Sequence, residues 1–262
     1  MNVAVCFFGL VGGAAGKDGY GGSLGPSIAG KLNMKNLIEQ NRADVFIHSW
    51  STDAEEDLID LYQPTDYLVE SQLEFDHDLK PNANRDFAEM ARRAWDFIFN
   101  RHQYEATGRK WRAESFRAHS RWYSQAQSLR LKADFEKKHG FIYDAVIVVR
   151  LDVAFYTPLD MSTYDLRYFY ASNWNDAPDE SSGEMNYQNH HLHRGFLDFW
   201  FFSNSSNMDR FGTLYSRINH YHPSPHRSSY QHASYLGLTK RYTLFRWEDH
   251  EMVRRKELDA EQ

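Results

Sequence analysis

The stretch YDAVIVVRLDVAFYTPL, residues 143–159, decides the fold of this chain. Five apolar residues, 145–149, follow one another without interruption and lead into Arg150 and Asp152. A continuous apolar run is typical of a strand buried on both faces in a parallel sheet. Side chains two positions apart on a strand project to the same side. We therefore expect Arg150 and Asp152 to stand together at the carboxyl end of a central strand.

Further apolar runs indicate the rest of the sheet. Strands are expected at 3–9, 43–50, 66–71, 167–172, 196–204 and 241–247. Helical patterns occupy 28–41, 53–62, 85–105, 113–140, 207–221 and 226–238. Alternation of strand and helix is typical of a parallel sheet with crossover helices. The prediction is one α/β domain spanning residues 1–262, with a Rossmann-like, mostly parallel central sheet flanked by helices.

The composition argues against several classes of protein. A formal net charge of −6 is unusual for a nucleic-acid-binding protein, which normally carries a basic face. No segment approaches the roughly 20 apolar residues of a membrane-spanning helix, and the N-terminus lacks the basic start of a signal peptide. Cys6 is the single cysteine and cannot form an internal disulfide, which predicts a reducing compartment. We expect a cytoplasmic protein with no transmembrane segment and no nucleic-acid partner.

A glycine-rich segment, residues 9–31, follows the first expected strand. Gly25 to Lys31 matches the first seven positions of the phosphate loop G-x-x-x-x-G-K-[ST], but Leu32 replaces the hydroxyl that holds magnesium. Pro26 offers no backbone N–H to a phosphate. We favour a loop that lies over a ligand at the carboxyl edge of the sheet. A kinase or sulfotransferase that uses Gly25–Lys31 is an alternative.

The pair Arg150 and Asp152 allows two interpretations. A carboxylate at the carboxyl edge of a parallel sheet can hold a divalent cation that bridges a nucleotide diphosphate, and an arginine can neutralise phosphate directly. The two side chains can equally form an internal ion pair that caps the strand. Their spacing alone does not decide between these interpretations.

Several blocks of this sequence resemble a group of GT-A-type glycosyltransferases, known from bacterial surface-polysaccharide clusters and from large viruses. The main block is residues 121–161, in which a helix with a tyrosine–serine pair precedes a strand ending in R-x-D, then a phenylalanine and a proline turn. Here these positions are Tyr123, Ser124, Arg150, Asp152, Phe155 and Pro158. The segments VAVCFFGL (3–10), DVFIHSWS (44–51), LYQPTDYLVE (61–70) and LDFWFFSNSSNMDRF (197–211) resemble other blocks in the same order.

The resemblance implies a GT-A-like fold and an enzyme that transfers a sugar from a nucleoside-diphosphate-sugar donor to a hydroxyl of a glycan. Asp152 would position the diphosphate, with or without a divalent cation (Mn or Mg), and Arg150 would neutralise the leaving group. The nucleotide pocket would be lined by Phe8, Gly9, His48, Trp50 and Ser124. Many GT-A enzymes have D-x-D where this chain has R-x-D, which weakens the expectation of a metal. In a viral protein the compartment would be the host cytoplasm.

Asp198 is a second candidate for chemistry because it interrupts the apolar run FLDFWFF, residues 196–202. A carboxylate in such a strand is costly unless it is paired or functional. In an inverting transferase a base must take the proton from the acceptor hydroxyl, and Asp198 is the candidate for this role. A salt bridge to a core arginine is the alternative interpretation. One of His220, His222 and His226 is expected to approach the donor phosphates.

The aromatic content of 16% suits either a well-filled core or a carbohydrate site. Trp50 could stack on a base or sugar, or pack at the edge of the sheet. A non-catalytic glycan-binding protein is therefore a second alternative, which nucleotide binding would exclude. The charged run 85–112 is most simply a solvated pair of helices.

Overall fold

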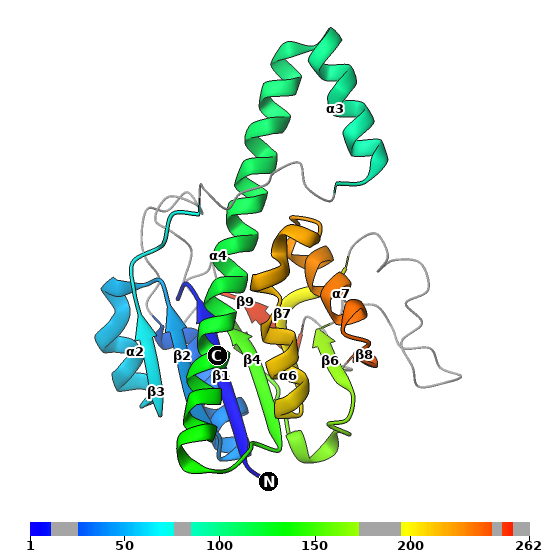
Figure 1. Cartoon of the computed structure of the whole chain (residues 1–262). Coiled ribbons are helices and arrows are strands. Elements are labelled where there is room, and N and C mark those ends of the chain that lie inside the picture. Colours follow the sequence, from blue (N-terminus) through cyan, green and yellow to red (C-terminus); the bar gives the residue numbers. More distant parts are fainter. Residues whose placement is uncertain (12–25, 76–84, 173–194, 243–247, 254–262) are drawn as a thin grey trace.

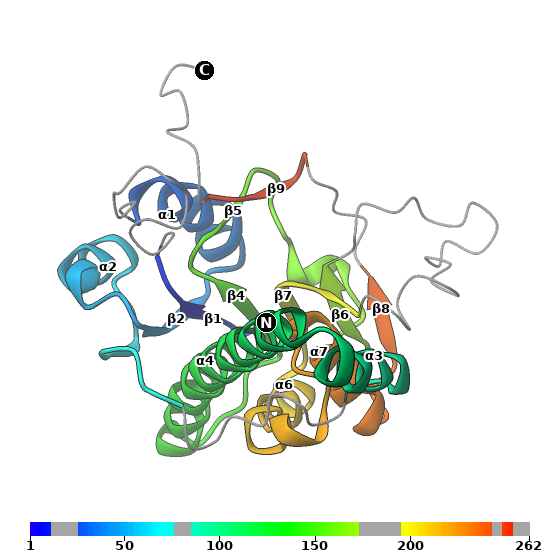
Figure 2. The ribbon, with the colours of Figure 1, turned by 90° about the horizontal axis from the view of Figure 1, so that it is seen from above.

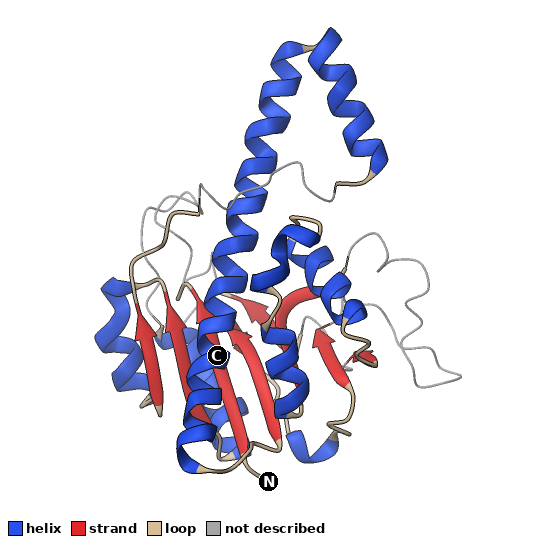
Figure 3. Cartoon of the chain, viewed as in Figure 1, coloured by secondary structure: helices blue, strands red, loops and turns tan. Residues whose placement is uncertain are grey.

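A seven-stranded sheet forms the centre of the computed structural model, which describes residues 1–11, 26–75, 85–172, 195–242 and 248–253 (Figure 1). The strands lie in the order β3-β2-β1-β4-β7-β6-β8. They are β1 (Val3–Gly9), β2 (Asp44–Ser49), β3 (Asp66–Val69), β4 (Ala145–Arg150), β6 (Phe169–Ser172), β7 (Leu197–Ser203) and β8 (Lys240–Tyr242). Only β7 runs against the others, since it pairs antiparallel with both β4 and β6 (Figure 3). The predicted mostly parallel α/β sheet is confirmed.

Helices cover both faces of the sheet (Figure 2). One face carries α1 (Ser27–Asn33), its π-helical continuation η1 (Met34–Glu39) and, after the short η2 (Thr52–Ala54), α2 (Glu55–Tyr62). The other face carries α4 (Arg101–His139), α6 (Ser205–Gly212), η4 (Tyr215–His220) and α7 (Pro225–Tyr235). The remaining helical segments are α3 (Phe87–Phe99) and η3 (Met161–Thr163).

The side chains of the central strands pack into two hydrophobic cores, one on each face of the sheet. In β1, Val5 and Phe7 pack on the side of α1 and α2, whereas Cys6 and Phe8 pack on the side of α4. This alternation follows from the two-residue period of a strand, and the continuous apolar sequence of β1 and of β4 up to Arg150 follows from burial on both faces. Cys6 is fully buried, as expected for a small core residue.

The long helix α4 ends where the sequence predicts and begins where it does not. Gly140 adopts a left-handed conformation (φ 71°) that ends the helix after three basic residues. At the other end, the expected helix 85–105 is divided at Asn100, whose side chain accepts a hydrogen bond from the N–H of Gln103. This N-cap starts α4 at Arg101 rather than near residue 113, so that α3 and α4 form an antiparallel hairpin.

A second, two-stranded sheet was not predicted from the sequence. It pairs β5 (Val153–Phe155) with β9 (His250–Met252). Two buried asparagines connect β5 to the neighbouring helical segments. Asn33 Nδ2 donates to Val153 O and Asn33 Oδ1 accepts from the N–H of Phe155, while Asn36 Nδ2 donates to Phe155 O. These side chains satisfy backbone groups that the short strand leaves unpaired. The turn that carries Asp152 is thereby held between the two sheets.

The other expected elements differ mainly at their ends. The helix predicted at 207–221 is divided into α6 and η4, and the strand predicted at 241–247 appears as β8, Lys240–Tyr242, with residues 243–247 outside the described part. Most of the glycine-rich segment, residues 12–25, also lies outside it. Within the described ranges, no helix combines the length and the apolar character needed to cross a membrane.

Candidate functional site

The order in which strands are added to the sheet reverses between β1 and β4. From β1 it moves outward through β2 to β3, and it then returns by way of α3 and α4 to β4 on the other side of β1. Phe8 is paired with Arg150 at the ends of these two strands, and the N–H of Leu151 donates to Phe8 O at 3.0 Å. Open α/β sheets bind their ligands outside the carboxyl ends of strands at such a switch point. The predicted site residues gather at this edge.

Arg150 and Asp152 form a bidentate ion pair with each other. Nε of Arg150 donates to Oδ1 of Asp152 at 2.7 Å, and Nη2 donates to Oδ2. Met252 of β9 contributes its sulfur at 3.4 Å from Nη2. The two side chains stand together at the strand end, as expected, but they are enclosed: Arg150 is 5% exposed and Asp152 3% exposed. The geometry is that of an ion pair that caps the strand.

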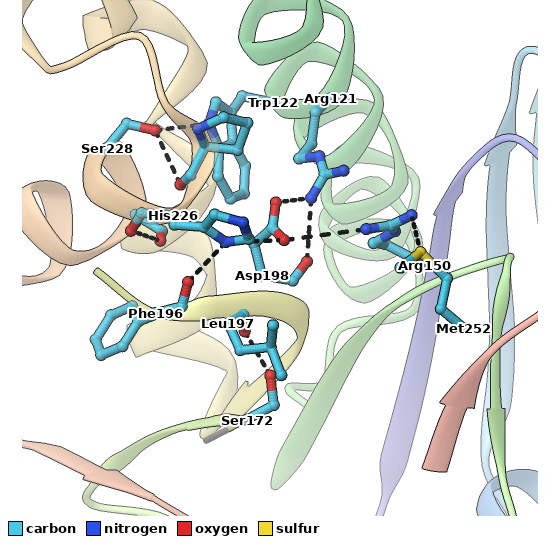
Figure 4. A network of polar contacts seen from close by, with 12 residues as sticks. Arg121, Trp122, Arg150, Ser172, Phe196, Leu197, Asp198, His226, Ser228 and Met252 are labelled. Atoms are coloured by element: carbon cyan, nitrogen blue, oxygen red, sulfur yellow. Dashed lines mark hydrogen bonds and ion pairs between the residues drawn. The ribbon is translucent and has the colours of Figure 1, made fainter. Parts of the chain in front are cut away.

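Asp198 lies beside this pair because β7 runs antiparallel to β4 and begins where β4 ends (Figure 4). Its carboxylate forms an ion pair with Arg121 of α4, lies 3.9 Å from Nη1 of Arg150, and lies 3.1 Å from Nδ1 of His226. The salt-bridge interpretation therefore describes its immediate contacts. Arg121, Arg150, Asp152 and Asp198 together carry no net charge. Each charged group faces one of opposite sign, and this attraction offsets the free-energy cost of removing the charges from water.

His226 is the one of the three candidate histidines that joins this network. Its Nδ1 faces both Asp198 and the carbonyl oxygen of Phe196, at 2.9 Å. Two acceptors at one ring nitrogen place the proton there. Burial and the nearby Arg121 lower the pKa of His226 to about 4, so the ring is neutral at pH 7. His220 is exposed at the surface.

A second polar group joins β1, β2 and α4 at the same edge of the sheet. Ser124 Oγ accepts from the N–H of Gly9 at 2.8 Å and lies 2.7 Å from Nδ1 of His48. Nε2 of His48 lies 3.0 Å from Glu70, directly after β3. Burial lowers the pKa of His48, against the opposing effect of Glu70. Gly9, His48 and Ser124 are thus brought together as predicted, although His48 and Ser124 are fully buried.

Trp50 and Phe8 contribute differently from each other. The Trp50 ring stacks on Tyr123 with centroids 5.4 Å apart and is 6% exposed. Its indole Nε1 is buried and has no hydrogen-bond partner among the described residues. Such an orphan donor is costly unless a ligand or water supplies an acceptor. The side chain of Phe8 is part of the core, so only its backbone reaches the edge.

The described donor set does not fit a resident divalent cation at Asp152. Both oxygens of Asp152 accept from the Arg150 guanidinium, which occupies the positions that a cation would need. Among the described residues, no cluster of three or more His, Cys, Asp or Glu side chains could hold a metal ion. The nearest cationic groups at this edge are arginines.

An open cleft of about 380 Å³ lies between α3, α4 and the start of α7. Arg227, which follows His226, lines it together with Lys110 and Trp111 of α4. His222 also lines the cleft, 3.4 Å from Glu89, and burial lowers its pKa to about 4. The remaining lining residues are Arg85, Glu89, Arg92, Gln103, Ala106, Thr107, Glu114 and Ser224. The cleft is polar and carries both signs of charge.

The segment Gly25–Lys31 has a structural explanation. Gly25 lies outside the described residues, but α1 already begins at Ser27, so Gly30 and Lys31 fall within the helix rather than at its entrance. A Cβ at Gly30 would come within 2.1 Å of Leu61, which shows that this glycine allows α1 to pack against α2. Lys31 is exposed.

Sequence reasoning missed three residues of the site. Arg121 lies three residues before Ser124 on α4, and residues at i and i+3 share a helix face, so this spacing could have pointed to it. Glu70 ends the segment that resembles a family block, and only the parallel pairing of β2 and β3 places it beside His48. Met252 reaches Arg150 through β9, for which the sequence gives no signal.

No family model matches the chain, and no curated protein matches it. The likeness to GT-A-type glycosyltransferases therefore stays an expectation that rests on the sequence blocks quoted above.

Proposed function

We propose that this protein is a glycosyltransferase that moves a sugar from a nucleoside-diphosphate-sugar donor to a hydroxyl of a glycan. The observation that carries the proposal is the position of the predicted residues at the switch point between β1 and β4. The indole N–H of Trp50, whose ring packs against His48 and Tyr123, has no hydrogen-bond partner among the described residues and supports a ligand with acceptor atoms here. Phosphate and sugar oxygens are such acceptors.

The charged residues at this edge would bind and neutralise the diphosphate of the donor. The diphosphate lies where β1, β2 and β4 end, and among the described residues Arg121 and Arg150 supply positive charge there. Of the two, Arg121 is the more exposed, at 18% of its side chain, and would meet the phosphate oxygens first. Asp152 holds the Arg150 guanidinium in a fixed orientation. A fixed positive group at the position where charge develops lowers the barrier without reorganisation.

The acceptor would lie in the polar cleft between α3, α4 and α7, next to Arg227. Its hydroxyl oxygen forms a bond to the anomeric carbon of the donor sugar while the bond from that carbon to the phosphate oxygen breaks. The nucleoside diphosphate leaves with the bonding electron pair. The hydroxyl proton passes to the Asp198–His226 pair, which supplies a carboxylate and a neutral imidazole 3.1 Å apart.

A thermal-shift screen tests the proposal. We expect a UDP-, GDP- or dTDP-sugar to raise the melting temperature, because a ligand that binds only the native state stabilises it. Each donor is tested with and without Mn, and the bidentate Arg150–Asp152 pair predicts a shift of similar size in both conditions. A shift with glycans and with none of the nucleotide sugars would contradict the proposal and favour a glycan-binding protein. A shift with ATP, removed by Lys31→Ala, would favour the kinase alternative.

A further inference from the structure

The helix α3 presents its apolar side to solvent. Six of its thirteen residues are large hydrophobic side chains that are 40–88% exposed: Phe87, Met90, Trp95, Phe97, Ile98 and Phe99. The described part of the chain has only seven other exposed residues of this kind, and they are scattered over other elements. Isolated exposed hydrophobics are ordinary, but a contiguous set marks an interaction site.

The polar side of α3 faces the rest of the protein instead. Arg93 donates to the carbonyl oxygen of Tyr104 and lies over its ring, with 4.0 Å between guanidinium carbon and centroid. Arg93 also lies 4.9 Å from the Trp111 ring, and Asp96 is buried against α4. Polar contacts thus fix the orientation of α3 on α4. The outward orientation of the apolar face therefore follows from these specific contacts between α3 and α4 and not from poor packing.

The place and charge of this face indicate what covers it. The α3–α4 hairpin projects past the carboxyl edge of the sheet and forms a convex tip (Figure 1). Residues 85–112 contain seven cationic and four acidic side chains, a net charge of +3 in a chain of net charge −6. The exposed Arg101 lies at the apolar face, with its guanidinium carbon 5.6 Å from the centroid of the Phe97 ring, and the exposed Arg92 and Arg109 belong to the same hairpin.

We propose that α3 lies in the interface of a membrane that carries anionic lipids, with its apolar face among the acyl chains. An amphipathic helix with Trp, Phe and Ile on one side and arginines around it is typical of interfacial binding, in which the helix lies along the bilayer and does not span it. A second copy of the chain fits less well, because it would bring an equal positive charge to a convex face. If the proposed function also holds, the acceptor glycan is anchored in that membrane.

Flotation of the full chain with lipid vesicles tests the inference. We expect binding to vesicles of phosphatidylcholine with phosphatidylglycerol, weaker binding to phosphatidylcholine alone, and a decrease with added salt. Ile98→Glu should reduce the bound fraction about tenfold, because a charge replaces an inserted apolar side chain. Ile142→Glu is the matched control: Ile142 is 71% exposed against 68% for Ile98, but it lies at the other end of α4, and its variant should bind like wild type.

A second readout concerns Trp95, which is 63% exposed. Its fluorescence should shift to the blue when anionic vesicles are added, and Trp95→Phe should lose that shift. Equal vesicle binding by wild type and Ile98→Glu would overturn the inference. So would a wild-type dimer that ignores vesicles and becomes monomeric in Ile98→Glu, since the face would then join two copies. None of these measurements needs a nucleotide sugar, so a failure here is distinct from a failure of the proposed function.

Discussion

Replacing Asp198 by asparagine is expected to lower the rate of sugar transfer by a factor on the order of 1,000. The variant keeps the size and shape of the side chain but removes the charge that faces His226 and the two arginines. The Asp198–His226 pair then has no carboxylate to take up the acceptor proton. Because the donor is bound by other groups, the loss should appear in kcat and leave the affinity for the nucleotide sugar within about tenfold.

The control must separate loss of a base from loss of a buried ion pair. Asp209→Asn provides it, since Asp209 is also paired with a buried cation, Lys132, but belongs to a network that includes no residue of the site. Asp209→Asn should lower stability and retain transfer at temperatures where it is folded. Retention of more than a tenth of wild-type kcat by folded Asp198→Asn would contradict the role given to Asp198.

Replacing Lys132 by methionine is expected to destabilise the fold by about 4 kcal/mol. The ammonium group is completely buried and donates to Glu136 at 2.9 Å, to Ser205 at 2.6 Å and to Asp209 at 2.6 Å. Without it, the buried Glu136 is left as an uncompensated charge, and Ser205 Oγ and the N–H of Tyr143 are the other donors to it among the described residues. Urea unfolding followed by circular dichroism measures the change in free energy.

Lys138→Met is the matched control for this second substitution. Lys138 lies in the last turn of the same helix but is exposed, so its replacement should change the free energy of unfolding by less than about 0.5 kcal/mol. Adding Glu136→Gln to Lys132→Met should recover part of the loss, because it removes the unpaired carboxylate. Equal stability of Lys132→Met and wild type would mean that the network contributes nothing to the fold.

The sheet could be predicted from the sequence because its signal is local. The unbroken apolar runs in β1 and β4 indicate that these strands are buried on both faces. The alternation of strands with helices along the chain indicates that the strands pair in parallel. The apolar period of α3 was also visible, but periodicity does not say which way a helix face points. The structure turns that face outward because Arg93 holds the polar side against α4, where it donates to Tyr104 O and lies over the Tyr104 and Trp111 rings.

The sequence predicted which candidate residues lie near one another better than it predicted how their side chains contact each other. Arg150, Asp152 and Asp198 do lie together, because strand ends are easy to locate in a chain with long apolar runs. The bidentate ion pair of Arg150 with Asp152 depends on the side-chain rotamers of both residues, which the sequence does not specify. The contact of Arg150 with Met252 depends on β9, more than 100 residues away in sequence. Arg121 could have been included through its helical spacing from Ser124.

Hydrogen exchange on the protein with its best nucleotide sugar tests most directly whether the donor lies at the switch point. We expect slower exchange at the strand ends, in peptides that cover residues 9–11, 49–51 and 150–153, where β1, β2 and β4 meet. The same peptides should show no change with a glycan alone. Protection confined to residues 26–33 of α1, or no protection at any of the three strand ends, would contradict the account.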